Sequence, residues 1–468
     1  MQVTLSQELY PNQLASWCQS IGNTWSDPVR HLCTDSREAG PQTVFCAIRG
    51  AKTDGHEYIQ RAYEAGCRCF LCETESPYLQ SAELEPAIQI IVPDTVAAFA
   101  VMADQYRRAM YPQIQTVAIT GSVGKTTTKE CVAAVLGQSG KTVFCKEGNY
   151  NSTIGLPLSM LEIPENTQLA VLEMGMSGLG EISSMSRAAR PNIGIITNVG
   201  TSHMEHLGSR ENIAKAKLEI CEGLQEGGTL LVNGDEPLLA DVSSDRFNVM
   251  TVSLSNRDSD FYAENIRTCG DGMMFDAVTP RGRYLNLYIP SIGEHIVWAA
   301  MFAVASGCLL GETEAQLRNG LNSYRPANMR QHIRQSGDFT VIEDCYNAAP
   351  ESMRAALSVL ETVAKGRRVA VLGDMKELGS VSEIQHRMIG AACVQRGVDL
   401  LVTVGEMGKW IAEGAITAGM DPSRVWITDG IESYANTAAR LRAELQAKDT
   451  VLVKASRSMA LEKLAVLL

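Results

Sequence analysis

Short apolar runs alternate with helix-like segments along most of this chain. Runs such as Thr116–Thr120, Leu169–Leu172 and Asn192–Thr197 have the length and the β-branched content of buried strands. Polar residues follow each run, and helix-like segments separate the runs. Because this rhythm is typical of βαβ units, the pattern predicts an α/β protein built on mostly parallel sheets.

The pattern divides the chain into three expected domains, of which the first covers residues 1–96. It holds a short strand at Val44–Ile48, a helix near Glu57–Ala65 and two apolar strands, Cys69–Cys72 and Gln89–Val92. Polar turns join these elements. We therefore expect a small α/β N-terminal domain.

The second expected domain covers residues 97–326. It begins at the amphipathic stretch Thr95–Met110 and contains the βαβ pattern. Residues 246–290 are β-rich and predict strands at the edge of its sheet. The apolar segment Ile296–Leu310 predicts a buried helix, since it is shorter than the ~20 residues that a membrane span needs. We expect a central domain with a P-loop-type, mostly parallel sheet and no membrane span.

The third expected domain, residues 327–468, again alternates strands and helices, and this pattern predicts a Rossmann-like, doubly wound domain. No G-x-G-x-x-G motif is present, so a dinucleotide cofactor is not indicated. The strands are expected at Thr340–Glu343, Arg368–Leu372, Leu400–Val404, Val425–Thr428 and Val451–Val453.

Composition narrows the class of protein. The 468 residues carry a formal net charge of −12 and no long Lys/Arg run, which argues against a nucleic-acid partner. The N-terminus lacks the basic and apolar regions of a signal peptide. Thirteen scattered cysteines predict a reduced, cytoplasmic enzyme. Cys67, Cys69 and Cys72 could bind zinc, but buried thiols of a strand are favoured.

A glycine loop directly follows the strand Thr116–Thr120 and reads Gly121-Ser122-Val123-Gly124-Lys125-Thr126-Thr127-Thr128. Strand, glycine turn and helix together aim backbone N–H groups and a helix N-terminus at a phosphate. Lys125 adds a positive charge, and a threonine hydroxyl can contact Mg²⁺. The spacing is shorter than in the standard P-loop, because Ile119 stands where the first glycine would be. The loop predicts a nucleoside triphosphate site.

Polar residues at neighbouring strand ends are expected to meet this loop. Glu173 ends one strand, Asn198 ends the next, and His203 lies in the loop beyond. In such sheets ligands gather at the carboxyl ends of the strands. Glu173 suits Mg²⁺ as a hard oxygen ligand, whereas His203 could be a loop histidine or a general base.

The chemistry of two further pairs of residues does not by itself decide whether they have a functional role. Lys215 and Lys217 lie on a helix-like segment and are consistent with an ordinary solvated face. Ser36 and Arg37 lie in a polar turn where they could contact an anion, although two polar residues in a loop prove little.

Motifs in every expected domain, in the same order, resemble those of the Mur ligase family of peptidoglycan synthesis. The N-terminal domain carries TDSREAGPQTVFCAIRG and DGHEYIQRAYEAG. The central domain carries TGSVGKTTTKE, GNYNSTIGLP, EMGMSGLGEI and TNVGTSHMEHLGSRENIAKAKLEI. The last domain carries DCYNAAPESM, LGDMKELG and VLVKASRSMALEKL. The resemblance spans nearly the whole chain and is specific because the motifs follow one another in order.

The resemblance implies an ATP-dependent, ADP-forming amide ligase. Its motifs are most similar to those of the family member that joins D-Ala-D-Ala to UDP-N-acetylmuramoyl-tripeptide through an acyl phosphate. The N-terminal domain would then bind the UDP-sugar, the central domain ATP, and the C-terminal domain the dipeptide while it closes over ATP. The implied partners are these small molecules, and the implied oligomeric state is a monomer. The third peptide residue, lysine or diaminopimelate, stays open.

The resemblance also implies residue roles. Lys125, His203 and Lys217 would be catalytic, with Lys217 carbamylated so that it becomes a carboxylate-like metal ligand. Two Mg²⁺ ions would be held by Thr126, Glu173, His203 and the Lys217 carbamate. ATP would be bound by Gly121, Ser122, Val123, Gly124, Lys125, Thr126, Thr127, Asn149, Arg330, Asp344 and Asn347. The other substrates would be bound by Ser36, Arg37, Asn151, Tyr346, Ser456 and Arg457.

The chain departs from the family pattern at a few positions. Ile296 and Ala299 replace asparagines that many relatives place near the adenosine. Ser152, Ala349 and Ala455 replace other common residues of the family motifs. The phosphate and metal residues are all present.

Two alternative functions remain at this level. The first is a related ligase that adds a single amino acid, or a folylpolyglutamate or cyanophycin-type enzyme with the same central domain. The second is an ATP-binding switch or regulatory protein. The combination of Glu173, His203 and Lys217 argues against the second, because a binding module does not need a second metal site.

Overall fold

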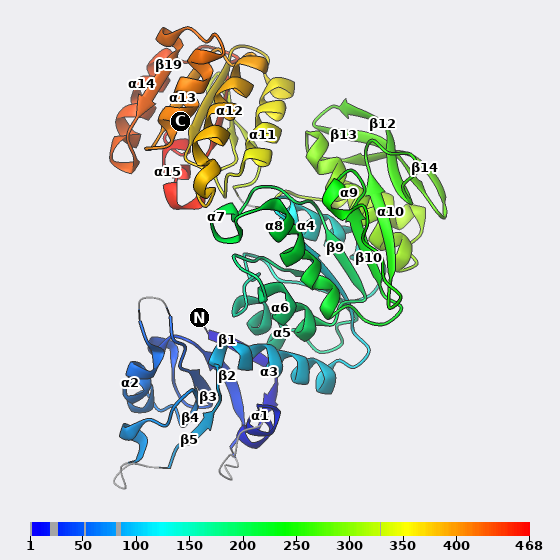
Figure 1. Cartoon of the computed structure of the whole chain (residues 1–468), viewed down its shortest axis with the longest axis vertical. Coiled ribbons are helices and arrows are strands. Elements are labelled where there is room, and N and C mark those ends of the chain that lie inside the picture. Colours follow the sequence, from blue (N-terminus) through cyan, green and yellow to red (C-terminus); the bar gives the residue numbers. More distant parts are fainter. Residues whose placement is uncertain (1, 19–26, 51–52, 81–85, 328) are drawn as a thin grey trace.

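The computed structural model describes residues 2–18, 27–50, 53–80, 86–327 and 329–468 and contains three separate sheets of five, nine and six strands. Figure 1 shows each sheet with its own helices, following one another along the chain from blue to red. The expected α/β class with three domains is confirmed. In each domain most strands run parallel and are separated by helices.

The N-terminal sheet has the order β1-β2-β3-β4-β5. Its first two strands pair antiparallel, whereas β2 to β5 pair parallel. The sequence pattern predicted β3, β4 and β5 but not β1 or β2. The strands are β1 (Gln2–Leu9), β2 (Val29–Cys33), β3 (Thr43–Cys46), β4 (Cys69–Cys72) and β5 (Ile88–Ile91), and the helices are α1 (Pro11–Trp17) and α2 (Ile59–Glu64).

The cysteines of the Cys67–Cys72 cluster are buried thiols. Cys69 and Cys72 lie in β4, and the Cys67 thiol donates to the carbonyl oxygens of Thr43 and Cys69 at 3.1 and 3.2 Å. Among the described residues, no group of three or more His, Cys, Asp or Glu side chains could hold a metal ion. The structure thus favours the buried-strand interpretation of this cluster over a zinc site.

The central sheet has the order β14-β13-β12-β11-β10-β9-β6-β8-β7. Strands β12 to β7 pair parallel, and β12, β13 and β14 form an antiparallel edge. The β-rich pattern of 246–290 predicted strands at the edge of the sheet but not their antiparallel pairing. The strands are β6 (Gln115–Thr120), β7 (Val143–Cys145), β8 (Leu169–Glu173), β9 (Ile193–Ile196), β10 (Thr229–Asn233), β11 (Asn248–Ser253), β12 (Phe261–Cys269), β13 (Gly272–Thr279) and β14 (Gly282–Ile289).

Helices cover both faces of this sheet because β6 is apolar on both sides. Val117 and Ile119 join the core under α4 and α9, whereas Ala118 joins the core of the other face, which continues into the N-terminal domain. The helices are α3 (Thr95–Met110), α4 (Lys125–Leu136), α5 (Gly155–Leu161), α6 (Glu181–Ala189), α7 (Met204–Leu207), α8 (Arg210–Leu218), α9 (Glu294–Leu309) and α10 (Glu314–Ser323).

Helix α9 is the buried helix that its apolar sequence predicted. Its side chains from Val297 to Ala305 are almost all inaccessible and pack against α4 and the central sheet. Across the described part of the chain, no helix combines the length and the apolar character that crossing a bilayer requires.

The C-terminal sheet has the order β15-β16-β20-β17-β18-β19. All neighbours pair parallel except β15, which pairs antiparallel with β16. The strands are β15 (His332–Ser336), β16 (Phe339–Glu343), β17 (Arg368–Gly373), β18 (Leu400–Val404), β19 (Val425–Thr428) and β20 (Thr450–Lys454). The helices are α11 (Pro350–Val363), α12 (Ser382–Gln395), α13 (Gly408–Thr417), α14 (Tyr434–Glu444) and α15 (Glu462–Ala465).

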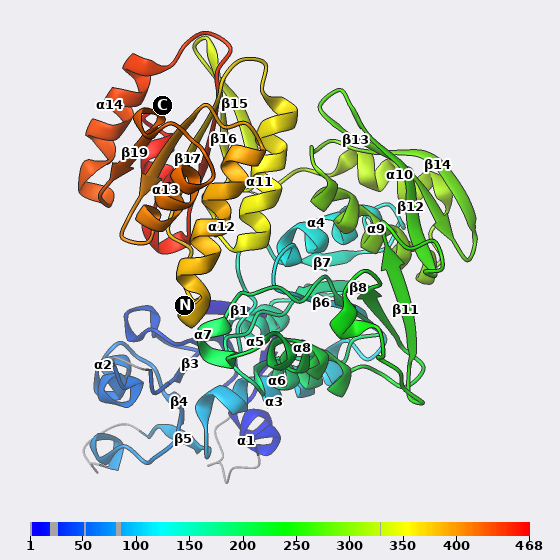
Figure 2. The same cartoon turned by 45° about the horizontal axis from the view of Figure 1, so that its top comes forward.

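The C-terminal domain touches the central domain on the side of the glycine loop. Figure 2 shows α7 of the central domain reaching toward the lower end of α12. The contact is made by backbone as well as side chains, since the N–H of Glu205 donates to the carbonyl oxygen of Glu377 at 3.2 Å. The two domains thereby enclose the strand ends where the sequence places its polar residues.

Candidate active site

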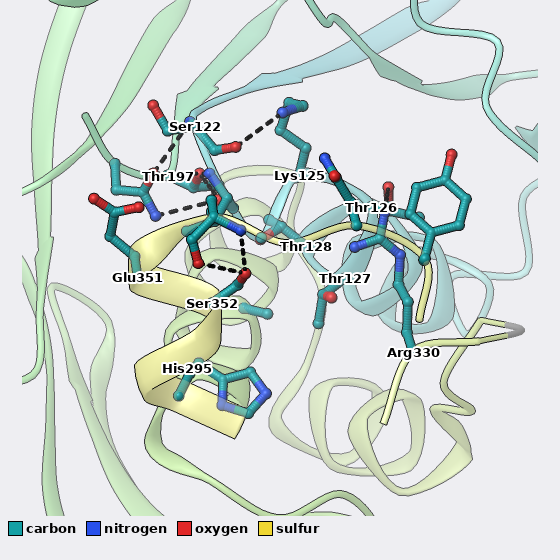
Figure 3. Close-up of a pocket in the computed structure, with 18 of the residues that line it drawn as sticks. Ser122, Lys125, Thr126, Thr127, Thr128, Thr197, His295, Arg330, Glu351 and Ser352 are labelled. Atoms are coloured by element: carbon teal, nitrogen blue, oxygen red, sulfur yellow. Dashed lines mark hydrogen bonds between the residues drawn. The ribbon is translucent and has the colours of Figure 1, made fainter. Parts of the chain in front are cut away.

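A cavity of about 680 Å³ lies between the central and C-terminal domains. Its wall combines the glycine loop after β6, the residues that follow β8 and β9, one side of α9, and the N-terminal half of α11. Figure 3 shows side chains from the glycine loop and from α11 facing the same space. Carboxyl ends of parallel strands and a helix N-terminus thus meet at one site, which is where ligands bind in such sheets.

The glycine loop is shaped by two glycines with positive φ. Gly121 has φ 151°, and a Cβ atom there would lie 1.9 Å from the hydroxyl oxygen of Thr197, so only glycine fits. Gly124 has φ 82° and precedes the first turn of α4. The backbone N–H groups of Ser122 and Val123 donate to the Asn198 side-chain oxygen at 3.1 and 3.0 Å. The loop is therefore held in an anion-binding shape by the next strand end.

Lys125 folds back across this loop. Its Nζ donates to the carbonyl oxygens of Gly121 and Ser122 at 2.7 and 3.3 Å. Burial lowers the pKa of the Lys125 amine, and the Glu173 carboxylate opposes that shift. The amine is anchored only by neutral carbonyl groups, so a phosphate that reached the loop would offer it a stronger, charged partner.

A polar network joins the loop to Glu173 and to the C-terminal domain. The Thr126 hydroxyl donates to Glu173 Oε2 at 2.7 Å, and Asn151 Nδ2 donates to Glu173 Oε1 at 2.8 Å. Arg330 donates to the Thr126 hydroxyl oxygen at 3.0 Å, and its guanidinium stacks 4.3 Å from the ring centre of Tyr346. Figure 3 shows Thr126 and Arg330 side by side at this wall of the cavity.

This network suits a hard cation. Thr126 and Glu173 are 8% and 5% exposed, and together they present oxygen atoms beside the phosphate loop. Oxygen ligands of this kind, next to substrate phosphates, are what Mg²⁺ prefers. His203 lines the same cavity, in the loop after β9. Of the side chains expected to hold a metal, Thr126, Glu173 and His203 are therefore brought to one site.

The C-terminal domain contributes a second network. The buried Lys454 Nζ donates to the Asp344 carboxylate at 2.6 Å and to the carbonyl oxygen of Asn347 at 2.9 Å. The N–H of Gln331 approaches Asp344 Oδ1 at 3.4 Å, and Gln331 Oε1 lies 3.0 Å from His295 Nε2. Burial lowers the pKa of His295, so this ring is neutral at physiological pH. Asp344 and Asn347 are thus rigidly placed in the cavity wall.

Lys217 lies in α8 and is 1% exposed, so the solvated-face interpretation is wrong for this lysine, whereas Lys215 on the same helix is exposed. Burial, and secondarily the charge of Lys125, lowers the pKa of Lys217 well below that of a free lysine. A lowered pKa favours the neutral, nucleophilic form of the amine. Lys217 is not one of the residues that line the cavity itself.

Several expected substrate residues lie outside the cavity wall. In the N-terminal domain, Ser36 is buried and Arg37 forms an ion pair with Asp35 at 2.5 Å. In the C-terminal domain, the Ser456 hydroxyl accepts from the N–H of Lys376 at 2.9 Å, and Arg457 pairs with Glu462 at 2.7 Å. Asn149, Asn151, Thr127 and Tyr346, by contrast, all line the cavity.

Ile296 and Ala299, the two departures from the family pattern, also line the cavity, on α9. Both are almost fully buried. Trp298 and Phe302 of α9 also line the cavity, so this part of the wall is apolar.

Sequence reasoning missed several residues of the site. Glu351, Lys454 and His295 line the cavity, and Glu377 contacts His203, yet none of them was singled out. Glu351 and Glu377 lie within the quoted motifs DCYNAAPESM and LGDMKELG, which were the available signal. Their partners belong to another domain, and no local pattern shows such a contact.

Family models match most of the chain. Residues 119–307 match the Mur ligase middle domain, residues 329–457 match the Mur ligase, glutamate ligase domain, and residues 28–107 match the Mur ligase family, catalytic domain. A curated relative, the UDP-N-acetylmuramoyl-tripeptide–D-alanyl-D-alanine ligase of Bacillus subtilis, is 37% identical over 441 residues. That match covers 93% of this chain and 92% of the relative.

Solved structures agree with this likeness. A crystal structure of MurF from Acinetobacter baumannii superposes with a TM-score of 0.89 at 28% identity, covering 99% of both chains. The MurF ligase from Thermotoga maritima in complex with ADP gives a TM-score of 0.81 at 25% identity, covering 93% of this chain and 96% of that one.

Proposed function

Because the chain belongs to the Mur ligase family, we propose that it joins D-Ala-D-Ala to the terminal carboxylate of UDP-N-acetylmuramoyl-tripeptide, with conversion of ATP to ADP and phosphate. The observation that carries this proposal is the near full-length likeness to a ligase of that activity, which includes all three domains. The enzyme would supply peptidoglycan precursors in the cytoplasm and act as a monomer.

Each domain has a proposed task. Residues 1–96 bind the UDP-sugar, residues 97–326 bind ATP and carry out the chemistry, and residues 327–468 bind the incoming dipeptide and close over ATP. The placement of the cavity between the central and C-terminal domains supports the last two assignments, because ATP and dipeptide must meet there.

The first step is phosphoryl transfer. A carboxylate oxygen of the tripeptide attacks the γ-phosphorus of ATP, the bond to the bridging oxygen breaks, and ADP leaves with that electron pair. Two anions must approach each other, so the protein has to neutralise charge. Lys125 brings positive charge to the cavity wall at the glycine loop, and Arg330 reaches the same place from the C-terminal domain.

Thr126, Glu173 and His203 would hold Mg²⁺, and Lys217 as a carbamate would complete a second metal position. Bound Mg²⁺ offsets the charge of the phosphates during transfer. The burial of Lys217 and its lowered pKa support the carbamate, because both favour the unprotonated amine and only that form can add to CO₂. In that reaction the nitrogen forms a bond to carbon and releases one proton.

The second step is amide formation. The neutral amine of D-Ala-D-Ala attacks the acyl phosphate, a tetrahedral intermediate forms, and inorganic phosphate departs. No protein nucleophile is required, because the acyl phosphate is already activated. Positioning of the two substrates supplies much of the acceleration. Asn151 and Tyr346 in the cavity wall, and Ser456 and Arg457 outside it, are the proposed substrate contacts.

The experiment is a phosphate-release assay with each substrate left out in turn. Release should require both the UDP-tripeptide and D-Ala-D-Ala, and single amino acids should not replace the dipeptide. Release with ATP alone would indicate an ATP-binding switch protein instead. Stimulation by a single amino acid would indicate a ligase of the other type.

A further inference from the structure

One segment of the central domain, residues 198–208, is held by the C-terminal domain at two points. It follows β9, includes α7 and carries His203. Glu351 at the start of α11 contacts its first half, and Glu377 after β17 contacts its second half. Both contacts are made by carboxylates of a different domain.

The contact at Glu377 is close and involves both side chain and backbone. Glu377 Oε2 lies 2.6 Å from His203 Nδ1, and the Glu377 carbonyl oxygen accepts from the N–H of Glu205 at 3.2 Å. Gly379, with φ +54°, packs against the same segment, where a Cβ atom would lie 2.9 Å from Glu205 Cα. The 377–379 segment is therefore shaped to fit residues 198–208.

Both partners have unusual backbone conformations. His203 and Glu377 each have φ 64°, in the left-handed region that non-glycine residues rarely adopt. Such conformations persist where the surroundings impose them, and they cluster at functional sites. The backbone of each residue is thus held so that the two side chains meet.

The contact at Glu351 ties the same segment of the central domain to the nucleotide site. Glu351 Oε1 accepts from the N–H and the hydroxyl of Thr201, both at 3.2 Å, and a Cβ atom on Gly200 would lie 2.8 Å from the Glu351 carboxyl carbon. The N–H of Gly200 donates to the hydroxyl of Ser122 in the glycine loop at 2.9 Å. Figure 3 shows Glu351 on α11 facing this part of the glycine loop.

We propose that Glu377 is a positioning residue that orients His203 for metal binding only when the C-terminal domain is docked. The Glu377 carboxylate, 2.6 Å from Nδ1, fixes the orientation of the ring, and Nε2 on the opposite side of the ring stays available to a metal. Because Glu377 belongs to the other domain, this arrangement exists only in the closed enzyme. The inference rests on the proposed function, since it assigns to His203 the metal-binding role given there.

The test compares Glu377→Ala with Glu377→Gln, which keeps the shape of the side chain and a polar oxygen beside Nδ1. We expect the Mg²⁺ concentration for half-maximal phosphate release to rise about 10-fold or more in Glu377→Ala and less than about 3-fold in Glu377→Gln. The KM for D-Ala-D-Ala should change little. The matched control is Glu432→Ala, at an exposed carboxylate elsewhere in the same domain.

A second readout does not use activity. The rise in Tm caused by Mg²⁺ with a non-hydrolysable ATP analogue should shrink in Glu377→Ala, while the Tm without ligands stays unchanged. In a His203→Ala background, adding Glu377→Ala should have no further effect on this rise. An unchanged Mg²⁺ dependence in Glu377→Ala, or an additive effect in the double variant, would overturn the proposal. The ligand-induced Tm shift remains measurable even if the wild type makes no product. Failure of the inference about Glu377 can therefore be distinguished from failure of the proposed function.

Discussion

The hydroxyl of Thr126 donates to Glu173 at 2.7 Å while it accepts from Arg330 of the C-terminal domain at 3.0 Å. One small side chain therefore links the glycine loop, the end of β8 and the second domain. A threonine hydroxyl is both donor and acceptor, so it can accommodate both partners at once. Without this hydroxyl, the Glu173 carboxylate would lose a hydrogen-bond donor and the Arg330 guanidinium would lose an acceptor.

Removing the hydroxyl without changing the shape of the side chain should therefore abolish most activity. We expect Thr126→Val to lower kcat for phosphate release by at least about 100-fold, because the hydroxyl faces both the phosphates and the proposed metal. Thr126→Ser keeps the hydroxyl and should retain most of kcat. Equal kcat values for the two variants would show that the hydroxyl has no role in the reaction.

Lys125 should be needed for phosphoryl transfer. Lys125→Ala removes the charge beside the phosphates, and we expect phosphate release to fall by about 10²–10³-fold. Lys215→Ala, at an exposed lysine, is the control and should behave like the wild type. Near-normal ATP-dependent release by Lys125→Ala would refute the assignment of the loop.

Lys217 should be replaceable in part by a small acid. Lys217→Ala leaves a space where a carbamate would stand, so added formate or acetate should restore a fraction of the lost phosphate release. The same acids should not stimulate the wild type or Lys215→Ala. Circular dichroism and Tm of Lys217→Ala exclude misfolding. A folded variant that no short carboxylic acid restores would contradict the carbamate role.

Stability should fall at mildly acidic pH because of His386. This fully buried ring accepts from the N–H of Met375 at 2.9 Å through Nε2, and burial lowers its pKa below the usual 6.5. The unfolded chain then binds the proton more strongly, so stability is lost as pH falls below 6.5, by up to about 1.4 kcal/mol per pH unit.

His386→Gln lacks a titrating ring, and its Tm should therefore depend less on pH between 5 and 7 than that of the wild type. Differential scanning fluorimetry at several pH values measures this difference. Identical pH profiles for the two proteins would show that His386 does not account for the acid sensitivity.

The sequence predicted most of the helices and strands that have a regular pattern of apolar and polar residues. The apolar strands β6, β8, β18 and β19 and the helix α3 (Thr95–Met110) coincide with the predicted segments to within a residue or two. These elements are buried on a face or stripe of fixed period, so local residues determine them. The strand β1 was missed because Gln2–Leu9 mixes polar and apolar residues, and its pairing with β2 shifts register between Thr4 and Leu9.

The same distinction applies to the site. The glycine loop, Glu173 and His203 could be predicted because strand ends in a parallel sheet meet at one edge. Burial of Lys217 could not, since its helix has the composition of an exposed one and only the resemblance singled this lysine out. Glu351 and Glu377 act on residues about 150 to 174 positions earlier in the chain, and only docking of the domains brings them there.

The most direct test of the proposed function is mass spectrometry of the product formed from ATP, UDP-N-acetylmuramoyl-tripeptide and D-Ala-D-Ala. The account predicts a UDP-linked product heavier than the tripeptide precursor by one D-Ala-D-Ala residue unit, together with stoichiometric ADP. ADP formation without that product, or a product extended by a single amino acid from an added mixture, would contradict it.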